Sequence, residues 1–105
     1  MKFDEGIAQK IKNTVLLADS GAQVILYGSR ARGTARADSD WDVLILLSRP
    51  SVSIKDEQYF RHQLYDLELE TGQSFSTFVY SVSDWNSRMS VTPLYQNVKL
   101  DGIVL

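Results

Sequence analysis

The sequence contains no cysteine, only two prolines and no long apolar run. Without cysteine the chain cannot form disulfides, thiolate metal sites or a cysteine nucleophile, and this composition suits a reducing cytoplasm. The longest apolar run, residues 43–47, is far shorter than the ~20 residues that span a bilayer, so we expect no membrane association. Residues 1–6 are charged and lack the apolar core of a signal peptide. Together these absences predict a soluble cytoplasmic protein.

A strong positive charge is also missing, since the net charge of the 105 residues is −2. The chain therefore lacks the basic character of a general nucleic-acid binder, although a local arginine cluster could still contact phosphates and a nucleic-acid acceptor stays open. Hydrophobic residues make up 44% of the sequence, which is enough for one packed core. With no repeat and no low-complexity linker, residues 1–105 are predicted to form a single domain.

The apolar periodicity predicts alternating helices and strands. The expected elements are a helix over 4–20, a strand over 23–27, a loop with helical turns over 29–37, a strand over 41–48, a helix over 54–71, a strand over 74–81 and a last helical segment from about 84, capped by Ser83 and interrupted by Pro93. The apolar end, residues 103–105, is expected to dock against the body. This order predicts an α/β (α+β) domain, with a small mixed sheet of three or slightly more strands and helices packed mainly on one face.

Asp40 and Asp42 form the most informative pair in the sequence, because they lie at the start of an apolar strand. Residues i and i+2 of a strand point to the same face, with their bases roughly 7 Å apart, so the two carboxylates repel each other unless a cation lies between them. Oxygen ligands favour a hard ion, so the pair predicts a Mg²⁺ (or Mn²⁺) site. By the same alternation, Trp41 is expected to point into the core on the opposite face.

Gly28 and Ser29 end the preceding predicted strand. A glycine there lets backbone N–H groups approach a ligand closely, and Ser29 is expected to cap the short helix that follows. Arg30, Arg32 and Arg36 then place three guanidinium groups nearby, which suit phosphate contacts, although each is equally suited to surface ion pairs. A phosphate cradle beside two metal carboxylates is the arrangement that a nucleoside triphosphate requires.

This stretch resembles the signature of the DNA polymerase β-like nucleotidyltransferases. Gly28-Ser29, ten further residues and then Asp40-x-Asp42 match the family pattern, and GSRARG…SDWDVLI is similar to the minimal members that are paired with toxins in bacteria and archaea. The resemblance implies a palm-like nucleotidyltransferase fold, in which Asp40 and Asp42 are catalytic metal ligands and Gly28, Ser29 and Arg30 contact the triphosphate. It implies transfer of a nucleotidyl group to a hydroxyl acceptor by Mg²⁺-assisted in-line displacement. We expect AMP transfer from ATP, and the sequence leaves another nucleoside triphosphate open as the donor. It also implies an antitoxin role with a helical toxin-like partner. Because so small a chain has few residues with which to bind an acceptor, a protein partner or a homodimer is expected.

The sequence departs from this family at one position. Active members carry a third carboxylate on the next core strand, where this chain has Ser76 and Thr77, and neither hydroxyl is an efficient base near neutral pH. The preceding predicted helix offers three acids that could replace this third carboxylate, namely Asp66, Glu68 and Glu70. The alternative hypothesis is therefore a catalytically degenerate module that binds a nucleotide or a protein partner.

Two other motifs are excluded by their own requirements. An EF-hand loop starting at Asp38 would need glycine and glutamate where the sequence has Val43 and Arg49. A P-loop starting at Gly28 would need lysine and serine or threonine where Thr34 and Ala35 stand.

Overall fold

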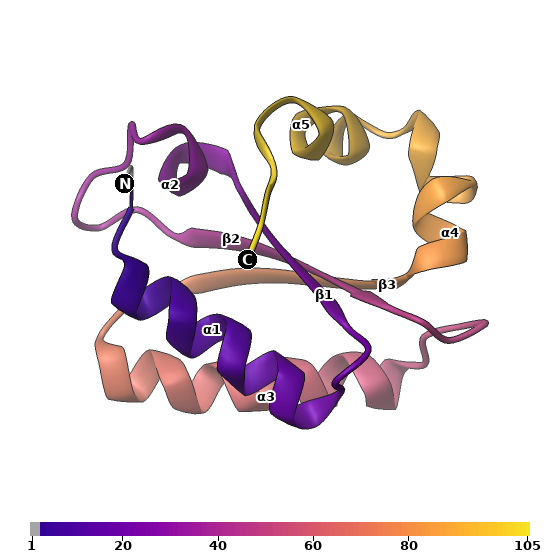
Figure 1. Ribbon diagram of the computed structural model, residues 1–105, viewed down its shortest axis with the longest axis horizontal. Coiled ribbons are helices and arrows are strands. Elements are labelled where there is room, and N and C mark those ends of the chain that lie inside the picture. The colour runs from indigo at the N-terminus through magenta and orange to yellow at the C-terminus, as the bar shows by residue number, and fades with distance from the viewer. Residues whose placement is uncertain (1–2) are drawn as a thin grey trace.

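The computed structural model describes residues 3–105, which form a four-stranded sheet with helices on both of its faces (Figure 1). In chain order the elements are α1 (Glu5–Ala18), β1 (Gln23–Tyr27), α2 (Gly28–Arg32), β2 (Trp41–Leu47), α3 (Ile54–Thr71), β3 (Phe75–Ser81), α4 (Val82–Asn86), the 3-10 helix η1 (Arg88–Val91), α5 (Pro93–Asp101) and β4 (Ile103–Val104). Within residues 3–105, no helix combines the length and the apolar character needed to cross a bilayer.

The sheet is mixed, as predicted, with the strand order β3-β2-β1-β4. β1 is antiparallel to both β2 and β4, whereas β2 and β3 are parallel. A parallel pair needs a long crossover connection, and the 18-residue helix α3 provides it. The apolar C-terminal end docks as expected, and it does so as a fourth strand in which Leu26 is paired with Ile103.

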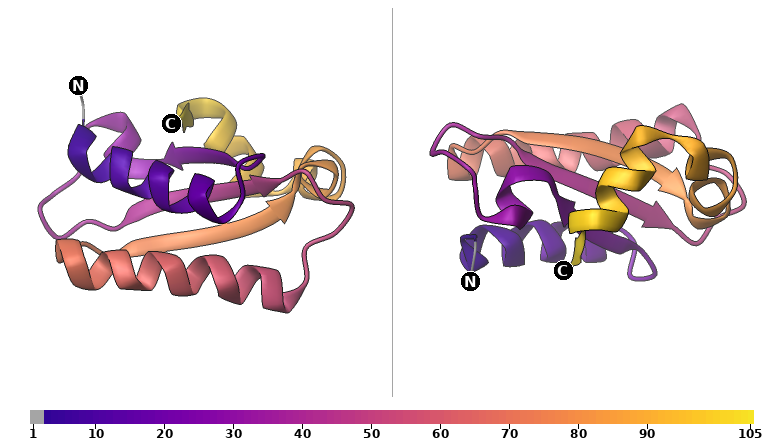
Figure 2. Two further views of the ribbon diagram at one scale, coloured as in Figure 1. Left: turned by 60° about the horizontal axis from the view of Figure 1, so that its bottom comes forward. Right: turned by 90° about the horizontal axis from the view of Figure 1, so that it is seen from above.

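The two long helices, α1 and α3, lie side by side on one face of the sheet (Figure 2). They share a core with alternate residues of the strands, and its fully buried members include Ile11, Trp41, Ile45, Phe60 and Leu64. Trp41 is 1% exposed and therefore lies in the core, as the alternation along β2 predicts.

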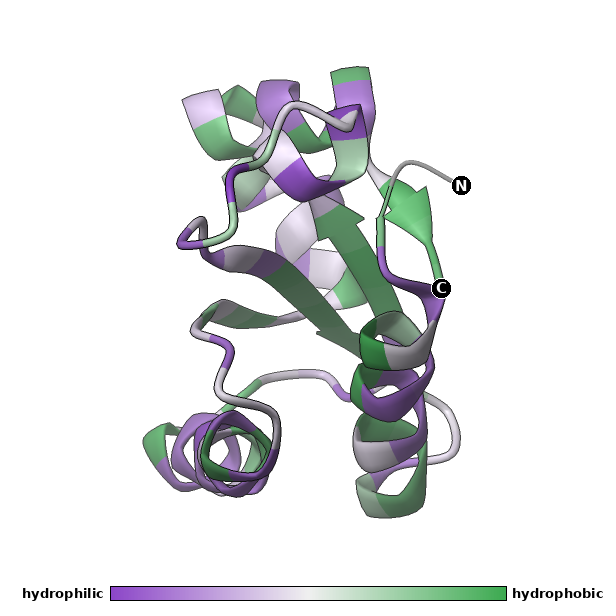
Figure 3. Cartoon of the chain, turned by 90° about the vertical axis from the view of Figure 1, so that its left-hand side faces the viewer, coloured by the Kyte–Doolittle hydropathy of each residue, from purple (hydrophilic) through white to green (hydrophobic). Residues whose placement is uncertain are grey.

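The shorter C-terminal helices α4 and α5 cover part of the opposite face. Their buried residues Trp85 and Val98 pack against Ile25, Leu44 and Leu46 of the central strands. The central strands are thus apolar on both faces, which appears in Figure 3 as green strands between two helical layers. The prediction that helices pack mainly on one face holds for the two long helices, and the smaller second layer adds to it.

Local capping explains where two of the helices begin. Ser53 and Asp56 form a capping box at the start of α3, with each side chain bonded to the other residue's backbone N–H. The prediction that Ser83 caps the next helix is wrong by two residues. The Oγ of Ser81 accepts the N–H of Asp84 at 3.1 Å, because β3 leads directly into α4. Pro93 is the first residue of α5, where its missing N–H costs no helical hydrogen bond.

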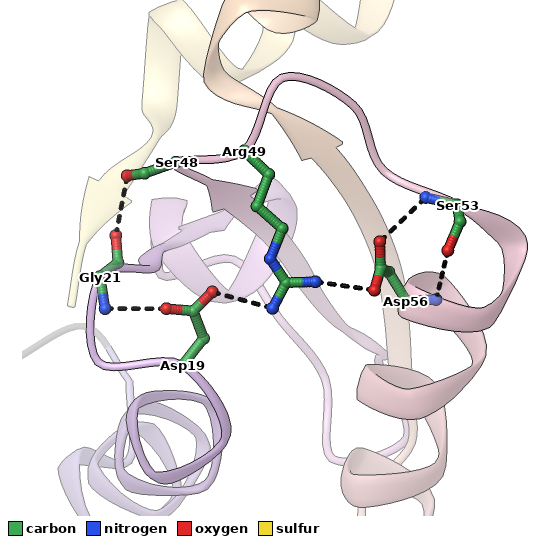
Figure 4. A network of polar contacts seen from close by, with 6 residues as sticks. All are labelled: Asp19, Gly21, Ser48, Arg49, Ser53 and Asp56. Carbon is green, nitrogen blue, oxygen red and sulfur yellow. Dashed lines mark hydrogen bonds and ion pairs between the residues drawn. The ribbon is translucent and has the colours of Figure 1, made fainter.

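Arg49, two residues after the end of β2, links the two long helices (Figure 4). Its guanidinium contacts Asp56 of α3 at 2.7 Å and Asp19, the residue that ends α1, at 3.2 Å. Asp19 in turn accepts the N–H of Gly21 at 2.9 Å. This network fixes the ends of α1 and α3 relative to the loop after β2.

Candidate functional site

The carboxylate of Asp42 lies where β1 ends and α2 begins. Tyr27, the last residue of β1, is the register partner of Asp42 in the antiparallel pair, and Gly28 follows Tyr27 directly. The prediction that the Gly28 turn and the two aspartates occupy adjacent strand ends is therefore confirmed. Asp40 precedes β2 and is exposed, whereas Asp42 is half-buried.

Gly28 and Asp42 fit closely together. Gly28 has a φ of 75°, in the left-handed region, and a β-carbon placed on it would overlap Oδ2 of Asp42 and lie 3.1 Å from its Cγ. Glycine is therefore required at this position for two reasons: the backbone conformation, and the space that the Asp42 carboxylate occupies.

The surroundings of Asp42 disfavour the ionised, negatively charged form of its side chain. Burial raises the pKa of Asp42 above its ordinary value, the neighbouring charge of Asp40 raises it further, and Asp101 adds to the effect, while Arg32 opposes it. A carboxylate held among like charges gains from an added cation more than a solvated one does. Asp40 and Asp42 thus share the electrostatic relationship that their i, i+2 spacing predicts.

Tyr27 is a site residue that sequence reasoning missed. Burial raises its pKa to about 12, and the charges of Asp42 and Asp101 contribute in the same direction. The phenol therefore stays protonated across the physiological range, as a neutral neighbour of the two acids. The sequence did contain a signal for Tyr27, since it is the last residue of the predicted strand and directly precedes the glycine of the site.

Ser29 does not cap α2, and that prediction is wrong. The helix starts one residue earlier than expected, its N-cap is Tyr27, and no side chain caps it. The reason is that β1 runs straight into α2 through the left-handed Gly28, which leaves no loop residue to serve as a side-chain cap. Ser29 lies within the first turn, where backbone N–H groups have no intrahelical acceptor.

Arg30 has structural partners in the loop before β2. Its Nη2 donates to the carbonyl of Ser39 at 2.8 Å, to that of Ala37 at 3.3 Å and to Oε1 of Gln73 at 3.3 Å. Its Cζ also lies 5.1 Å from the centre of the Trp41 ring. These contacts favour a role in positioning the loop that carries Asp40 over a direct phosphate contact.

Arg32 and Asp101 form the second unexpected part of the site. Nη1 of Arg32 lies 2.7 Å from Oδ2 of Asp101, and Oδ1 of Asp101 accepts the N–H of Gly28 at 3.4 Å. Asp101 ends α5, 73 residues after Gly28, so no local sequence pattern could have indicated it. Arg36, by contrast, is exposed, and its backbone N–H and C=O groups bond to Ser39.

None of the predicted substitutes for a third carboxylate reaches Asp42. Ser76 is the register partner of Asp42 on β3, so this hydroxyl occupies the position nearest to the carboxylate on that strand. Glu68 accepts the N–H of Phe75 at 3.3 Å, and Glu70 pairs with Lys10 at 3.6 Å. Both belong to α3, as Asp66 does, and α3 covers the opposite face of the sheet.

A groove of about 680 Å³ lies away from these residues. It runs between α3 and the outer edge of β3 and is lined by Arg61, His62, Tyr65, Glu68 and Thr77. Thr77, the other candidate for the third carboxylate position, therefore points away from Asp42. The groove lacks both aspartates, so its size alone does not make it the reactive site.

The acids of the site suit a hard divalent cation, although they form an incomplete ligand set. Burial and the charge of Asp40 raise the pKa of Asp42, and Gly28 leaves open the space that the Asp42 carboxylate fills. Among residues 3–105 there is no cluster of three or more histidine and acidic side chains that could hold a metal ion. A bound cation would therefore complete its shell with phosphate oxygens and water.

A comparison with protein-family models gives a match over more than half of the chain. The sequence profile of the nucleotidyltransferase domain matches residues 8–76, which include β1, α2, β2 and α3. No curated protein gives a significant match to the chain.

A solved structure supports the fold independently. The chain is similar, with a TM-score of 0.67, to a crystal structure described as a toxin–antitoxin with AMP-PNP. The likeness covers 91% of this chain and 69% of that one at 18% sequence identity. At this level of identity the likeness shows the fold.

Proposed function

Because this chain belongs to the nucleotidyltransferase domain family, we propose that it binds a nucleoside triphosphate at Asp40 and Asp42 and transfers the nucleotidyl group to a hydroxyl acceptor. The observation that carries this proposal is the position of the Asp42 carboxylate. It packs against Gly28, and burial and the charge of Asp40 make its ionised form unfavourable. A triphosphate with its divalent cation is the ligand that satisfies both features, since it brings positive charge to the acids and phosphate oxygens to the glycine turn.

The proposed step is an in-line displacement. The acceptor oxygen attacks the α-phosphorus, the bond between that phosphorus and the bridging oxygen breaks, and pyrophosphate leaves while the acceptor proton passes to solvent. When bound, Mg²⁺ or Mn²⁺ supplies charge neutralisation at the attacking and leaving oxygens.

The chain's own residues would hold the reactants in place. Asp40 and Asp42 bind the cation, and the turn at Gly28 and Ser29 accommodates phosphate oxygens. Arg30 holds the loop between α2 and β2 through its hydrogen bond to the carbonyl of Ser39. This contact positions Asp40, which follows Ser39 directly. Correct positioning of reacting groups supplies a large part of the rate enhancement in reactions of this kind.

We propose ATP as the donor and a protein as the partner. The solved neighbour contains AMP-PNP and is described as a toxin–antitoxin. By analogy, this chain would act as the antitoxin and transfer AMP to a hydroxyl group on its toxin partner.

The test is transfer of label from α-labelled ATP to candidate acceptors in the presence of Mg²⁺. We expect labelling by the unchanged chain and its loss in Asp40→Asn and Asp42→Asn. Asp38→Asn is the matched control, because Asp38 is an exposed acid of the same loop. Labelling that persists in the Asp42→Asn variant would contradict the assignment.

A second candidate function, nucleotide binding without turnover, rests on Ser76. The register partner of Asp42 on β3 is a hydroxyl that is a poor base near neutral pH. If Mg²⁺–ATP binds but no pyrophosphate appears with any acceptor, the binding function is favoured. If Ser76→Asp creates transfer activity in an inactive chain, the missing carboxylate is the reason.

A further inference from the structure

The C-terminal elements α5 and β4 hold Asp101 beside the proposed nucleotide site. It is the last residue of α5, and after Gly102 the short strand β4 pairs with β1 through Ile25 and Leu26. Figures 1 and 2 show α2 and α5 on the same side of the sheet, near the end of β1. The fold thus carries an acid from the far end of the sequence to the start of α2.

The carboxylate of Asp101 uses two donors that a phosphate would use. Its Oδ2 lies 2.7 Å from Nη1 of Arg32, and its Oδ1 accepts the N–H of Gly28 at 3.4 Å. The side chain of Asp101 is 15% exposed, whereas that of Arg32 is 51% exposed. The acid is therefore held in the site, while the guanidinium remains accessible from solvent.

The charges around Asp42 are unbalanced in this arrangement. The charges of Asp40 and Asp101 oppose the ionisation of Asp42, and among residues 3–105 the charge of Arg32 offsets them. With Arg32 held by Asp101, an approaching triphosphate meets the carboxylate of Asp101 at the guanidinium that it would contact. An added anion would be repelled by Asp101 unless it displaced that carboxylate from Arg32.

We propose that Asp101 is an internal competitor of the triphosphate, which displaces it from Arg32 and Gly28 on binding. This inference rests on the proposed function and adds a regulatory contact to it. A phosphate oxygen replaces a carboxylate oxygen on the same guanidinium, so the number of charge-assisted hydrogen bonds at Arg32 is kept.

Asp101 is a poor candidate for the missing metal ligand. Its oxygens instead bind a guanidinium and an amide. The two roles also predict opposite effects on nucleotide affinity, because a lost ligand weakens binding whereas a lost competitor strengthens it.

The test compares the affinities of the unchanged chain and Asp101→Asn for Mg²⁺–ATP, tripolyphosphate and adenosine by calorimetry. We expect Asp101→Asn to bind Mg²⁺–ATP and tripolyphosphate about fivefold more tightly, the effect of losing one partly exposed ion pair, and adenosine without change. Asp84→Asn is the matched control, because it removes the surface pair between Asp84 of α4 and Arg88 of η1 and leaves the site intact.

A second variant protects the test against a folding effect. Arg32→Gln should bind Mg²⁺–ATP more weakly, and adding Asp101→Asn to it should increase the affinity by less than Asp101→Asn does in the unchanged chain. The amide resonance of Gly28 should move in the same direction on ATP binding as on Asp101→Asn substitution.

The outcomes separate this inference from the proposed function. If Asp101→Asn binds Mg²⁺–ATP equally or less tightly while Asp42→Asn abolishes binding, the inference is wrong and the nucleotide site stands. If neither the unchanged chain nor Asp101→Asn binds Mg²⁺–ATP, both are overturned.

Discussion

The carboxylate of Asp42 occupies the space that a side chain on Gly28 would need. Antiparallel pairing of β1 with β2 brings the two residues together, since Tyr27 and Asp42 are register partners. The glycine turn and the acid pair therefore form one structural unit, and a change in either should be detected at the other.

Gly28→Ala should reduce both stability and nucleotide binding. A non-glycine residue at a φ of 75° costs about 1–2 kcal/mol, and the new methyl group would also displace the carboxylate of Asp42. Gly72→Ala is the matched control, because Gly72 has a φ of 71° with nothing within 4 Å of an added β-carbon. Chemical denaturation should show a loss of stability in both variants, and calorimetry with Mg²⁺–ATP a loss of binding in Gly28→Ala alone. Equal binding by the two variants would disprove the close fit of Gly28 and Asp42.

Asp42→Asn should stabilise the metal-free protein at neutral pH. The folded-state pKa of Asp42 lies above its ordinary value of 3.8, so the folded chain holds this proton more tightly than the unfolded chain. The contribution of Asp42 to stability is therefore greatest below pH 3.8 and declines as the pH rises through the folded-state pKa. We expect a melting temperature about 3 °C higher in the variant at pH 7, and no difference at pH 3. An unchanged or lower value at pH 7 would show that the charge of Asp42 is already compensated.

Arg30→Ala should loosen the loop that carries Asp40. The substitution removes three hydrogen bonds from Nη2 and the contact with Trp41, for a loss of about 2–3 kcal/mol in the free energy of unfolding. Hydrogen exchange should be faster at Ser39 and its neighbours. Arg36→Ala, which shortens an exposed side chain, is the control and should leave the exchange unchanged. If Arg30→Ala weakens ATP binding without affecting exchange or stability, Arg30 contacts phosphate directly.

Ser53→Ala should weaken the start of α3 without affecting the nucleotide site. It removes the Oγ that accepts the N–H of Asp56 at 3.1 Å, and the loss of such a cap costs about 1 kcal/mol. Urea denaturation measures the change, with Ser51→Ala as the control at a nearby exposed serine. Full stability of Ser53→Ala would mean that Arg49 and Asp56 hold the helix end without the cap.

Local patterns predicted the order of the elements and the position of the acid pair. Periodicity at 3.6 and 2 residues follows from burial against one sheet, so α1, α3 and the three longer strands were expected where they occur. Asp40 and Asp42 could be recognised because strand alternation is a local rule. The nucleotidyltransferase resemblance was carried by the same short segment, and the match over residues 8–76 confirms it.

Features that depend on distant parts of the chain could not be predicted. Asp101 reaches Gly28 only because β4 pairs with β1, and two apolar residues at a chain end do not identify their partner strand. The partners of Arg30, the Ser39 carbonyl and Gln73, are set by tertiary contacts, so the sequence around Arg30 could not indicate them. The caps at Ser29 and Ser83 were misplaced for a third reason, since a strand that runs directly into a helix moves the helix start by a residue or two.

Metal-dependent ATP binding by the unchanged chain and by Asp42→Asn, measured by calorimetry with and without Mg²⁺, tests the central claim most directly. We predict that ATP binds the unchanged chain in the presence of Mg²⁺, that chelation of the metal removes most of the affinity, and that Asp42→Asn binds no better with Mg²⁺ than without it. Equal affinity of the two proteins for Mg²⁺–ATP would contradict a nucleotide site built on Asp42 and Gly28.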